Sequence, residues 1–160
     1  RTARNAIAPG SNDTRGILLG GATPDYISDI TSINVQSLGS DSSYGSALEG
    51  AIRNAAAAQN ETKGLFGGGE GPSANYRSIV SYVFATSGSG TKFGELSDDP
   101  NSNTAVSSGI RGVWAGGGTP TTSPSTSNTI EYVTIATEGN SIDFGDLVNS
   151  YNFRYGCAIR

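Results

Sequence analysis

The chain has 160 residues, of which 23 are glycine and none is histidine, and its net charge is −4. The negative charge argues against a nucleic-acid partner, because such a protein presents a basic face to phosphates. The lack of histidine excludes a Ser-His-Asp triad, a histidine-ligated metal and an imidazole base within this chain. No apolar run approaches the roughly 18 residues of a membrane span, so no membrane insertion is expected.

A motif of a basic residue, an apolar run and a glycine pair occurs three times along the chain. It begins at Arg15, Lys63 and Arg111, so the starts lie 48 residues apart. A fixed period of this length predicts a repeat architecture. Glycine after an apolar run ends a strand and supplies a positive φ without steric cost. Each copy therefore predicts an equivalent strand.

Each motif is followed by a second strand-like run and a fixed set of glycines. An isoleucine starts the run, a glycine follows nine residues later, and an aromatic–glycine pair comes five residues after that glycine. The three sets are Ile30, Gly39 and Tyr44-Gly45; Ile79, Gly88 and Phe93-Gly94; and Ile130, Gly139 and Phe144-Gly145. The β-branched and aromatic composition of these runs predicts strands.

One segment carries a competing signal. Residues 46–59 are rich in alanine, which favours a helix. The equivalent segments around Arg4 and Arg154 are not helix-like, so we interpret this one as a strand too.

With about four short strands in each repeat, the sequence resembles the kelch motif of β-propellers. Arg4 and Arg53 match its leading arginine, and Tyr82 and Tyr132 fall in its third strand. Its double glycine matches Gly20-Gly21, Gly67-Gly68 and Gly116-Gly117, and its last-strand aromatic matches Tyr44, Phe93 and Phe144. The sequence departs from the motif in lacking a leading arginine before the third unit and a tryptophan at the last-strand aromatic.

This resemblance implies an all-β fold of kelch-like propeller blades within a single repeat domain. Three four-stranded antiparallel units are expected at about residues 1–50, 51–98 and 99–149, and residues 150–160 would begin a fourth. Closed propellers have 4–8 blades, so three blades form an incomplete ring. Its two end faces are expected to pack on further blades of a longer parent chain or on further copies; the strand expected at residues 153–160 favours the longer parent.

A narrower resemblance covers residues 111–147, which are similar to repeats in structural proteins of tailed phages, particularly marine and cyanobacterial ones. It implies a virion location, in a tail, fibre or capsid-associated part, with other virion proteins as partners. It implies a structural or interaction role rather than an enzymatic one.

Three long loops at residues 22–29, 70–77 and 119–128 are candidates for contact with a host surface glycan or receptor. Variable loops on a regular framework commonly carry binding function. The candidate ligand-contacting residues in them are Asp25, Tyr26, Asn75, Tyr76, Thr119, Thr121, Thr122, Ser123, Ser125 and Asn128.

Other recurring residues are expected to serve the repeat itself. Arg15, Lys63 and Arg111 are expected to make the same inter-blade or strand-end hydrogen bonds, with a ring of ligand contacts as the alternative. Two sets of equivalent large side chains are expected to be buried between blades. They are Leu18, Phe66 and Trp114, and Tyr44, Phe93 and Phe144. Cys157 is interpreted as a small buried hydrophobe.

No cofactor, metal or catalytic residue is assigned from the sequence. A calcium loop at Asn140, Asp143 and Asp146 is the alternative to turn hydrogen bonding there. A glycan-cleaving enzyme would draw its acid–base pair from Asp98, Asp99, Glu95, Asp143 and Asp146, for which a solvated face is favoured. The Asn-x-Thr sequons at Asn12 and Asn60 are interpreted as surface turns rather than glycosylation sites.

Overall fold

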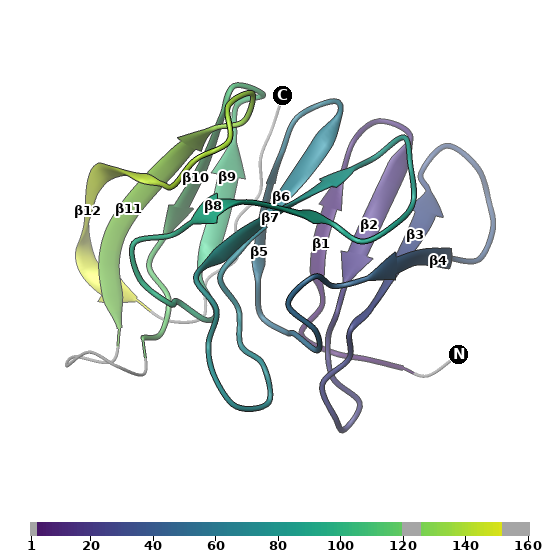
Figure 1. The fold of residues 1–160 in the computed structure, drawn as a ribbon, viewed down its shortest axis with the longest axis horizontal. Coiled ribbons are helices and arrows are strands. Elements are labelled where there is room, and N and C mark those ends of the chain that lie inside the picture. Colours follow the sequence, from purple (N-terminus) through teal and green to yellow (C-terminus); the bar gives the residue numbers. More distant parts are fainter. Residues whose placement is uncertain (1–2, 120–125, 152–160) are drawn as a thin grey trace.

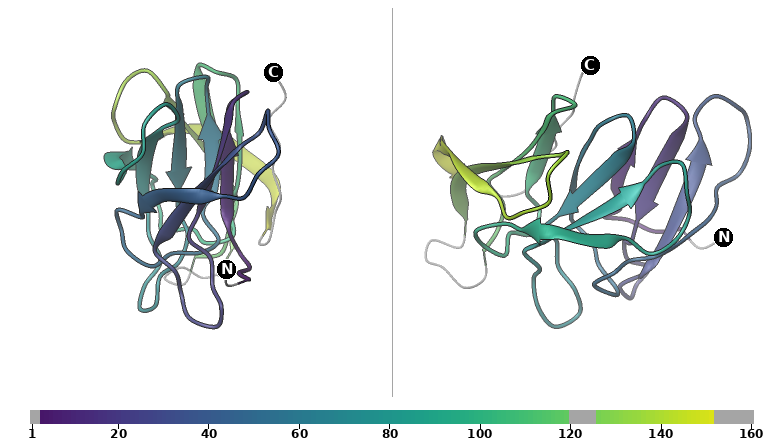
Figure 2. Two further views of the ribbon diagram at one scale, coloured as in Figure 1. Left: turned by 90° about the vertical axis from the view of Figure 1, so that its right-hand side faces the viewer. Right: turned by 45° about the horizontal axis from the view of Figure 1, so that its top comes forward.

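The computed structural model describes residues 3–119 and 126–151, which form three antiparallel four-stranded sheets and contain no helix. The sheets lie side by side in chain order (Figure 1), and Figure 2 shows them from two further directions. This confirms the all-β, four-stranded antiparallel units expected from the repeat. The strand expected at residues 153–160, with Cys157, lies outside the described residues.

Each sheet is built from four consecutive strands. Sheet 1 contains β1 (Ala8–Ser11), β2 (Arg15–Leu19), β3 (Asp29–Asn34) and β4 (Ser42–Ser46). Sheet 2 contains β5 (Ala56–Gln59), β6 (Lys63–Gly67), β7 (Ser78–Val83) and β8 (Thr91–Glu95). Sheet 3 contains β9 (Thr104–Ser107), β10 (Arg111–Ala115), β11 (Ser127–Thr134) and β12 (Ile142–Tyr151).

The repeated motif occupies the second strand of every sheet. Its register with the first strand is the same each time: Pro9 faces Leu18, Ala57 faces Phe66, and Ala105 faces Trp114. The predicted equivalence of the three copies is confirmed. The alanine-rich segment forms no helix, but the strand interpretation holds only in part: residues 56–59 form β5, and residues 47–55 are turns and irregular chain.

One detail of the expected alignment is wrong by a single residue. Arg53 bridges to Glu70, and the equivalent bridge in the first unit joins Asn5 to Ala22. The counterpart of Arg53 is therefore Asn5, not Arg4. The Arg4 guanidinium instead donates to the backbone oxygen of Gly20 at 3.0 Å, which ties down the end of β2.

The apolar cores lie between the sheets. The first core joins sheets 1 and 2, and its members include Ile17, Tyr44, Phe66 and Tyr82. The second joins sheets 2 and 3 and includes Leu65, Phe93, Trp114 and Val133. We call the side of a sheet that contacts the next sheet in the chain its front face, and the opposite side its rear face. Successive side chains along a strand point to opposite faces of the sheet, so each residue lies on either the front or the rear face.

Burial follows this arrangement and corrects two expectations. Phe66 and Trp114 are 2% and 1% exposed, and Tyr44 and Phe93 are 5% and 3% exposed, as predicted. Phe144, however, is 56% exposed, and Leu18 is only half-buried. The reason is position: Phe144 lies on the front face of sheet 3 and Leu18 on the rear face of sheet 1, and no other sheet of the described residues covers these faces.

Candidate functional site

The contact between neighbouring sheets is built around a β-bulge. The pairing of third and fourth strands shifts register once in sheets 1 and 2, so that Tyr44 and Phe93 are the extra residues. The same shift in sheet 3 makes Phe144 the extra residue. A bulged residue is left out of the ladder, so its carbonyl is free to bond elsewhere.

The bulge carbonyl is used by the next sheet. The Gly88 N–H donates to the Tyr44 carbonyl at 2.8 Å, and the Gly139 N–H donates to the Phe93 carbonyl at 2.9 Å. The glycine after the aromatic residue makes room for this approach: a Cβ on Gly45 would meet the Gly88 oxygen at 2.5 Å. The spacing of these glycines was visible in the sequence, but the contact that they form with one another was not predicted.

A second series of hydrogen bonds joins the points where the chain enters each sheet. Ala6, Asn54 and Ser102 all have positive φ, at 54°, 58° and 53°. The Asn54 N–H donates to the Ala6 carbonyl at 3.0 Å, and the Ser102 N–H donates to the Asn54 carbonyl at 3.1 Å. Both series of backbone hydrogen bonds therefore link neighbouring sheets, in addition to the apolar cores.

The repeated basic residue also reaches across this contact in the first unit. The Arg15 guanidinium donates to the carbonyl of Phe84, in the segment after β7, at 2.8 Å. The Lys63 Nζ atom lies 5.9 Å from the centre of the Phe93 ring, and the Arg111 Cζ atom lies 4.6 Å from the centre of the Tyr132 ring. The expected inter-sheet hydrogen bond is thus found for Arg15, while no sheet beyond sheet 3 is present among residues 3–119 and 126–151 for Arg111 to reach.

The two outer faces of the three-sheet stack are partly apolar. On the front face of sheet 3, Phe144 packs edge-to-face on Tyr132 with ring centres 5.9 Å apart, and Val106 is 42% exposed. On the rear face of sheet 1, Ile33 and Val35 are 36% and 47% exposed. These residues are the counterparts of buried ones in the other sheets, so each outer face resembles an inter-sheet face that no described sheet covers.

The candidate ligand loops at residues 22–29 and 70–77 connect second to third strands and lie at one edge of the stack, at the bottom of Figure 1. Asp25 is exposed, whereas Tyr26 is half-buried, with the Arg53 guanidinium 4.5 Å from its ring centre. Asn75 donates to the backbone oxygen of Asp99 at 3.0 Å.

The remaining loop candidates are also placed by the fold. Tyr76 packs against the first core, Thr119 is 1% exposed, and Asn128 is half-buried. The side chain of Thr119 is therefore not available to a ligand, contrary to its proposed role. Thr121, Thr122, Ser123 and Ser125 lie outside the described residues.

Glu70 is a residue that the sequence did not single out. Its carboxylate accepts from Arg53 Nε at 2.5 Å, from Asn101 at 3.2 Å and from the Tyr26 hydroxyl at 3.4 Å. It thereby joins the loop of sheet 1 to the entry segments of sheets 2 and 3. Its counterparts are Ala22 and Gly118, so no repeated signal marked it.

Two of the carboxylates considered as an acid–base pair, Glu95 and Asp98, make structural contacts. Glu95 pairs with Arg77 at 2.7 Å, and a hydrogen bond from Lys92, 2.6 Å away, lowers its pKa. A glycosidase acid needs a raised pKa, so Glu95 is poorly suited to that role. Asp98 accepts from the backbone N–H of Asp99 at 2.9 Å.

The segment considered for calcium is arranged as a turn. Asp143 accepts from the Gly145 N–H at 2.9 Å, and Asn140 accepts from the Glu95 N–H at 3.1 Å in the neighbouring sheet. Within residues 3–119 and 126–151, no group of three acidic, histidine or cysteine side chains is close enough to hold a metal ion. The same ranges contain no helix long and apolar enough to cross a membrane.

Both sequons form the same turn. The Asn12 side-chain oxygen accepts from the N–H groups of Thr14 and Arg15 at 3.0 and 2.8 Å, and Asn60 accepts from Thr62 and Lys63 at 2.9 Å each. These bonds close the hairpins before β2 and β6. The interpretation of the sequons as surface turns is therefore supported by their geometry.

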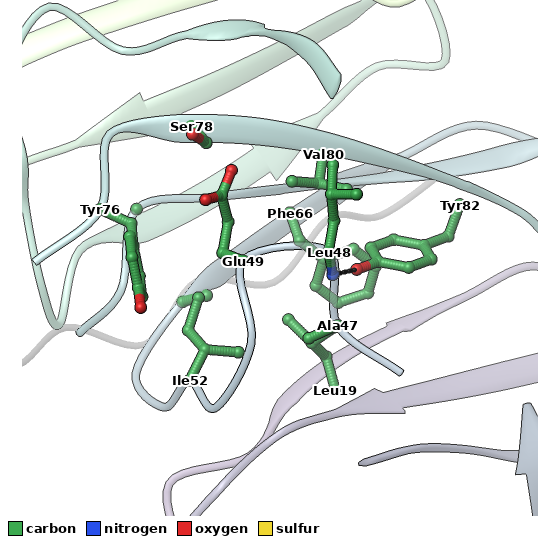
Figure 3. Close-up of a pocket in the computed structure, with 12 residues that line it drawn as sticks. Leu19, Ala47, Leu48, Glu49, Ile52, Phe66, Tyr76, Ser78, Val80 and Tyr82 are labelled. Carbon is green, nitrogen blue, oxygen red and sulfur yellow. Dashed lines mark hydrogen bonds between the residues drawn. The ribbon is translucent and has the colours of Figure 1, made fainter. Parts of the chain in front are cut away.

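A crevice between sheets 1 and 2 is too small for an organic ligand. Figure 3 shows its lining, with Ile52, Tyr76 and Tyr82 around it, and its free space of about 10 Å³ would hold about one water molecule. The Tyr82 hydroxyl accepts from the Leu48 N–H at 3.3 Å, and burial raises the pKa of Tyr82 to about 12. The crevice is part of the core packing.

Comparison with known proteins adds no relative: neither a family model nor a curated protein matches the sequence.

Proposed function

We propose that the protein is a structural component of a larger protein assembly, in which its three sheets are consecutive kelch-like blades of an incomplete propeller. The observation that carries the proposal is the pair of outer faces, at Phe144 and at Ile33, which repeat the chemistry of the buried inter-sheet faces. Exposed apolar patches of this kind mark interaction surfaces.

The contacts between first strands support the blade arrangement. β1 contacts β5, and β5 contacts β9. In a propeller the innermost strands of successive blades are neighbours around the central channel. The same side of each sheet would then face the axis, and the loops at residues 22–29 and 70–77 would share one rim.

We further propose that the assembly is a phage particle. This part rests on the resemblance of residues 111–147 to phage structural repeats. A glycan-binding role has less support, because Tyr26, Asn75 and Thr119 make contacts within the protein. A glycan-cleaving enzyme has the least, because Glu95 and Asp98 are tied into local contacts.

The proposal is tested by photo-crosslinking in the native assembly. Phe144→p-benzoylphenylalanine and Ile33→p-benzoylphenylalanine place a reactive group on each outer face. Val83, which is 44% exposed on sheet 2, is the matched control position. We expect protein crosslinks from both outer faces and few from the control, in material that purifies with virions. Protein that is absent from particles and gives no crosslink at either face would reject the proposal.

A further inference from the structure

We infer that the partner of the outer faces is a second copy of this chain, bound head to tail, so that two copies form one six-sheet ring. This inference rests on the proposed function and names the occupant of the same faces. The contact between neighbouring sheets occurs twice within the described residues. One half of this contact is exposed again on the front face of sheet 3, and the other half on the rear face of sheet 1.

The front face of sheet 3 presents the apolar half of the contact. Val113, Ile130 and Phe144 stand where sheet 2 presents Leu65, Ile79 and Phe93 to sheet 3. The latter three are 3% exposed or less, whereas Phe144 is 56% exposed. The sheet 3 face is thus built to be covered by the rear face of another unit.

The rear face of sheet 1 presents the complementary half. Leu18 and Ile33 stand where sheet 2 presents Phe66 and Tyr82 to sheet 1, because their strand registers are equivalent. Phe66 and Tyr82 are each 2% exposed. Leu18 and Ile33 are smaller than these aromatic residues but equally apolar.

The backbone groups of the two faces are complementary as well. Phe144 is a bulged residue like Tyr44 and Phe93, and on the described chain nothing lies within 4 Å of a Cβ built on Gly145. At the other end, Gly39 is the counterpart of Gly88, and its N–H has no backbone partner among the described residues. A second copy would let the partner's Gly39 N–H donate to the Phe144 carbonyl, as Gly88 does to Tyr44.

The repeated basic residue extends this match. Arg15 bonds the Phe84 carbonyl of the next sheet, and Val35 is the residue of sheet 1 that corresponds to Phe84. Arg111 is the first residue of β10 and is exposed. In the head-to-tail contact, the Arg111 guanidinium is placed to donate to the partner's Val35 carbonyl.

Ring closure fixes the number of copies. A head-to-tail contact forms a closed ring when its rotations sum to a full turn, and otherwise forms an open filament. Closed propellers have 4–8 blades. The described residues of one copy form three sheets, and six is the one multiple of three in that range, so two copies would give a closed ring.

The test uses sedimentation of the protein with one face blocked at a time. Phe144→Asp blocks the front face and Ile33→Asp the rear face, and both residues are partly exposed, so the fold of each variant is checked by circular dichroism. Val83→Asp is the control. We expect a dimer for the unmodified protein and the control, and a monomer for each face variant alone.

Mixing the two variants identifies the geometry. The free front face of the Ile33→Asp variant then meets the free rear face of the Phe144→Asp variant, so a dimer with one contact should form only in the mixture. A face variant that still dimerises alone would overturn the inference, because its copies must then pair through identical faces. An unmodified monomer, or an assembly larger than a dimer, would also overturn it, while crosslinks from Phe144 to a different protein would leave the proposed function standing.

Discussion

At the residue scale, glycine is required where two sheets approach most closely. A Cβ on Gly94 would lie far nearer to the Gly139 carbonyl oxygen than van der Waals contact permits, and the blocking atom is backbone. The backbone at Gly94 is not in the positive-φ region, so the requirement is for space and not for conformation. Substitution there therefore tests the contact itself.

We expect Gly94→Ala to lower the free energy of unfolding by about 1–3 kcal/mol, as overpacking in a core typically does. The added methyl group must push sheet 3 away from the bulge or break the Gly139–Phe93 hydrogen bond. The measurement is urea denaturation at fixed protein concentration. Thr91→Ala, on the exposed part of the same strand, should change stability by less than about 0.5 kcal/mol. Equal stability of the two variants would contradict the close approach.

Tyr82 gives the core a predictable response to alkali. Burial raises its pKa to about 12 in the folded state, against about 10 when unfolded. Below pH 10 both states keep the proton; between pH 10 and 12 the unfolded state ionises first, so stability is lost as pH rises. The loss should reach about 2–3 kcal/mol.

The check is the free energy of unfolding measured across this pH range. Tyr82→Phe should have a shallower decline than the unmodified protein. Some decline should remain, because burial also raises the pKa of Tyr44. Parallel curves for the two proteins would show that the Tyr82 hydroxyl ionises as easily in the folded state as in the unfolded chain.

At the scale of elements, the hairpin turns depend on a side-chain oxygen. The Asn60 oxygen accepts from the N–H groups of Thr62 and Lys63 and from the Thr62 hydroxyl. Asn60→Ala should cost about 1 kcal/mol, the typical net value of such hydrogen bonding at an exposed site. Asn60→Asp keeps an acceptor in the same place and should retain most of the stability in thermal denaturation. If both substitutions were neutral, the oxygen would have no part in the turn.

The strands themselves could be predicted from the sequence because they recur. The 48-residue spacing located β2, β6 and β10 as equivalent strands, and the strand composition after Ile30, Ile79 and Ile130 located the next strand of each sheet. Single features were harder. Glu70 joins three segments but has no acidic counterpart in the other units, so no pattern could reveal it.

At the scale of the whole molecule, burial depends on neighbours that the repeat cannot specify. Phe144 is followed by glycine, an acidic residue and leucine, as Phe93 is, yet 56% of Phe144 is exposed whereas Phe93 is 3% exposed. The repeat predicts which face a side chain occupies, because strand alternation is local. Whether that face is buried depends on whether another sheet packs on it, and the sequence of a single repeat does not specify the number of sheets.

The central claim is that the outer faces are inter-sheet contacts completed by another unit. The most direct measurement is amide hydrogen exchange by NMR at Gly39, Gly88 and Gly139 in the assembled protein. Gly88 and Gly139 bond the neighbouring sheet within the chain and should be protected. We predict that Gly39 is protected to a similar degree in the assembly and loses that protection in the Phe144→Asp monomer. Exchange of Gly39 at the rate of an unfolded chain in the assembled protein would contradict the account.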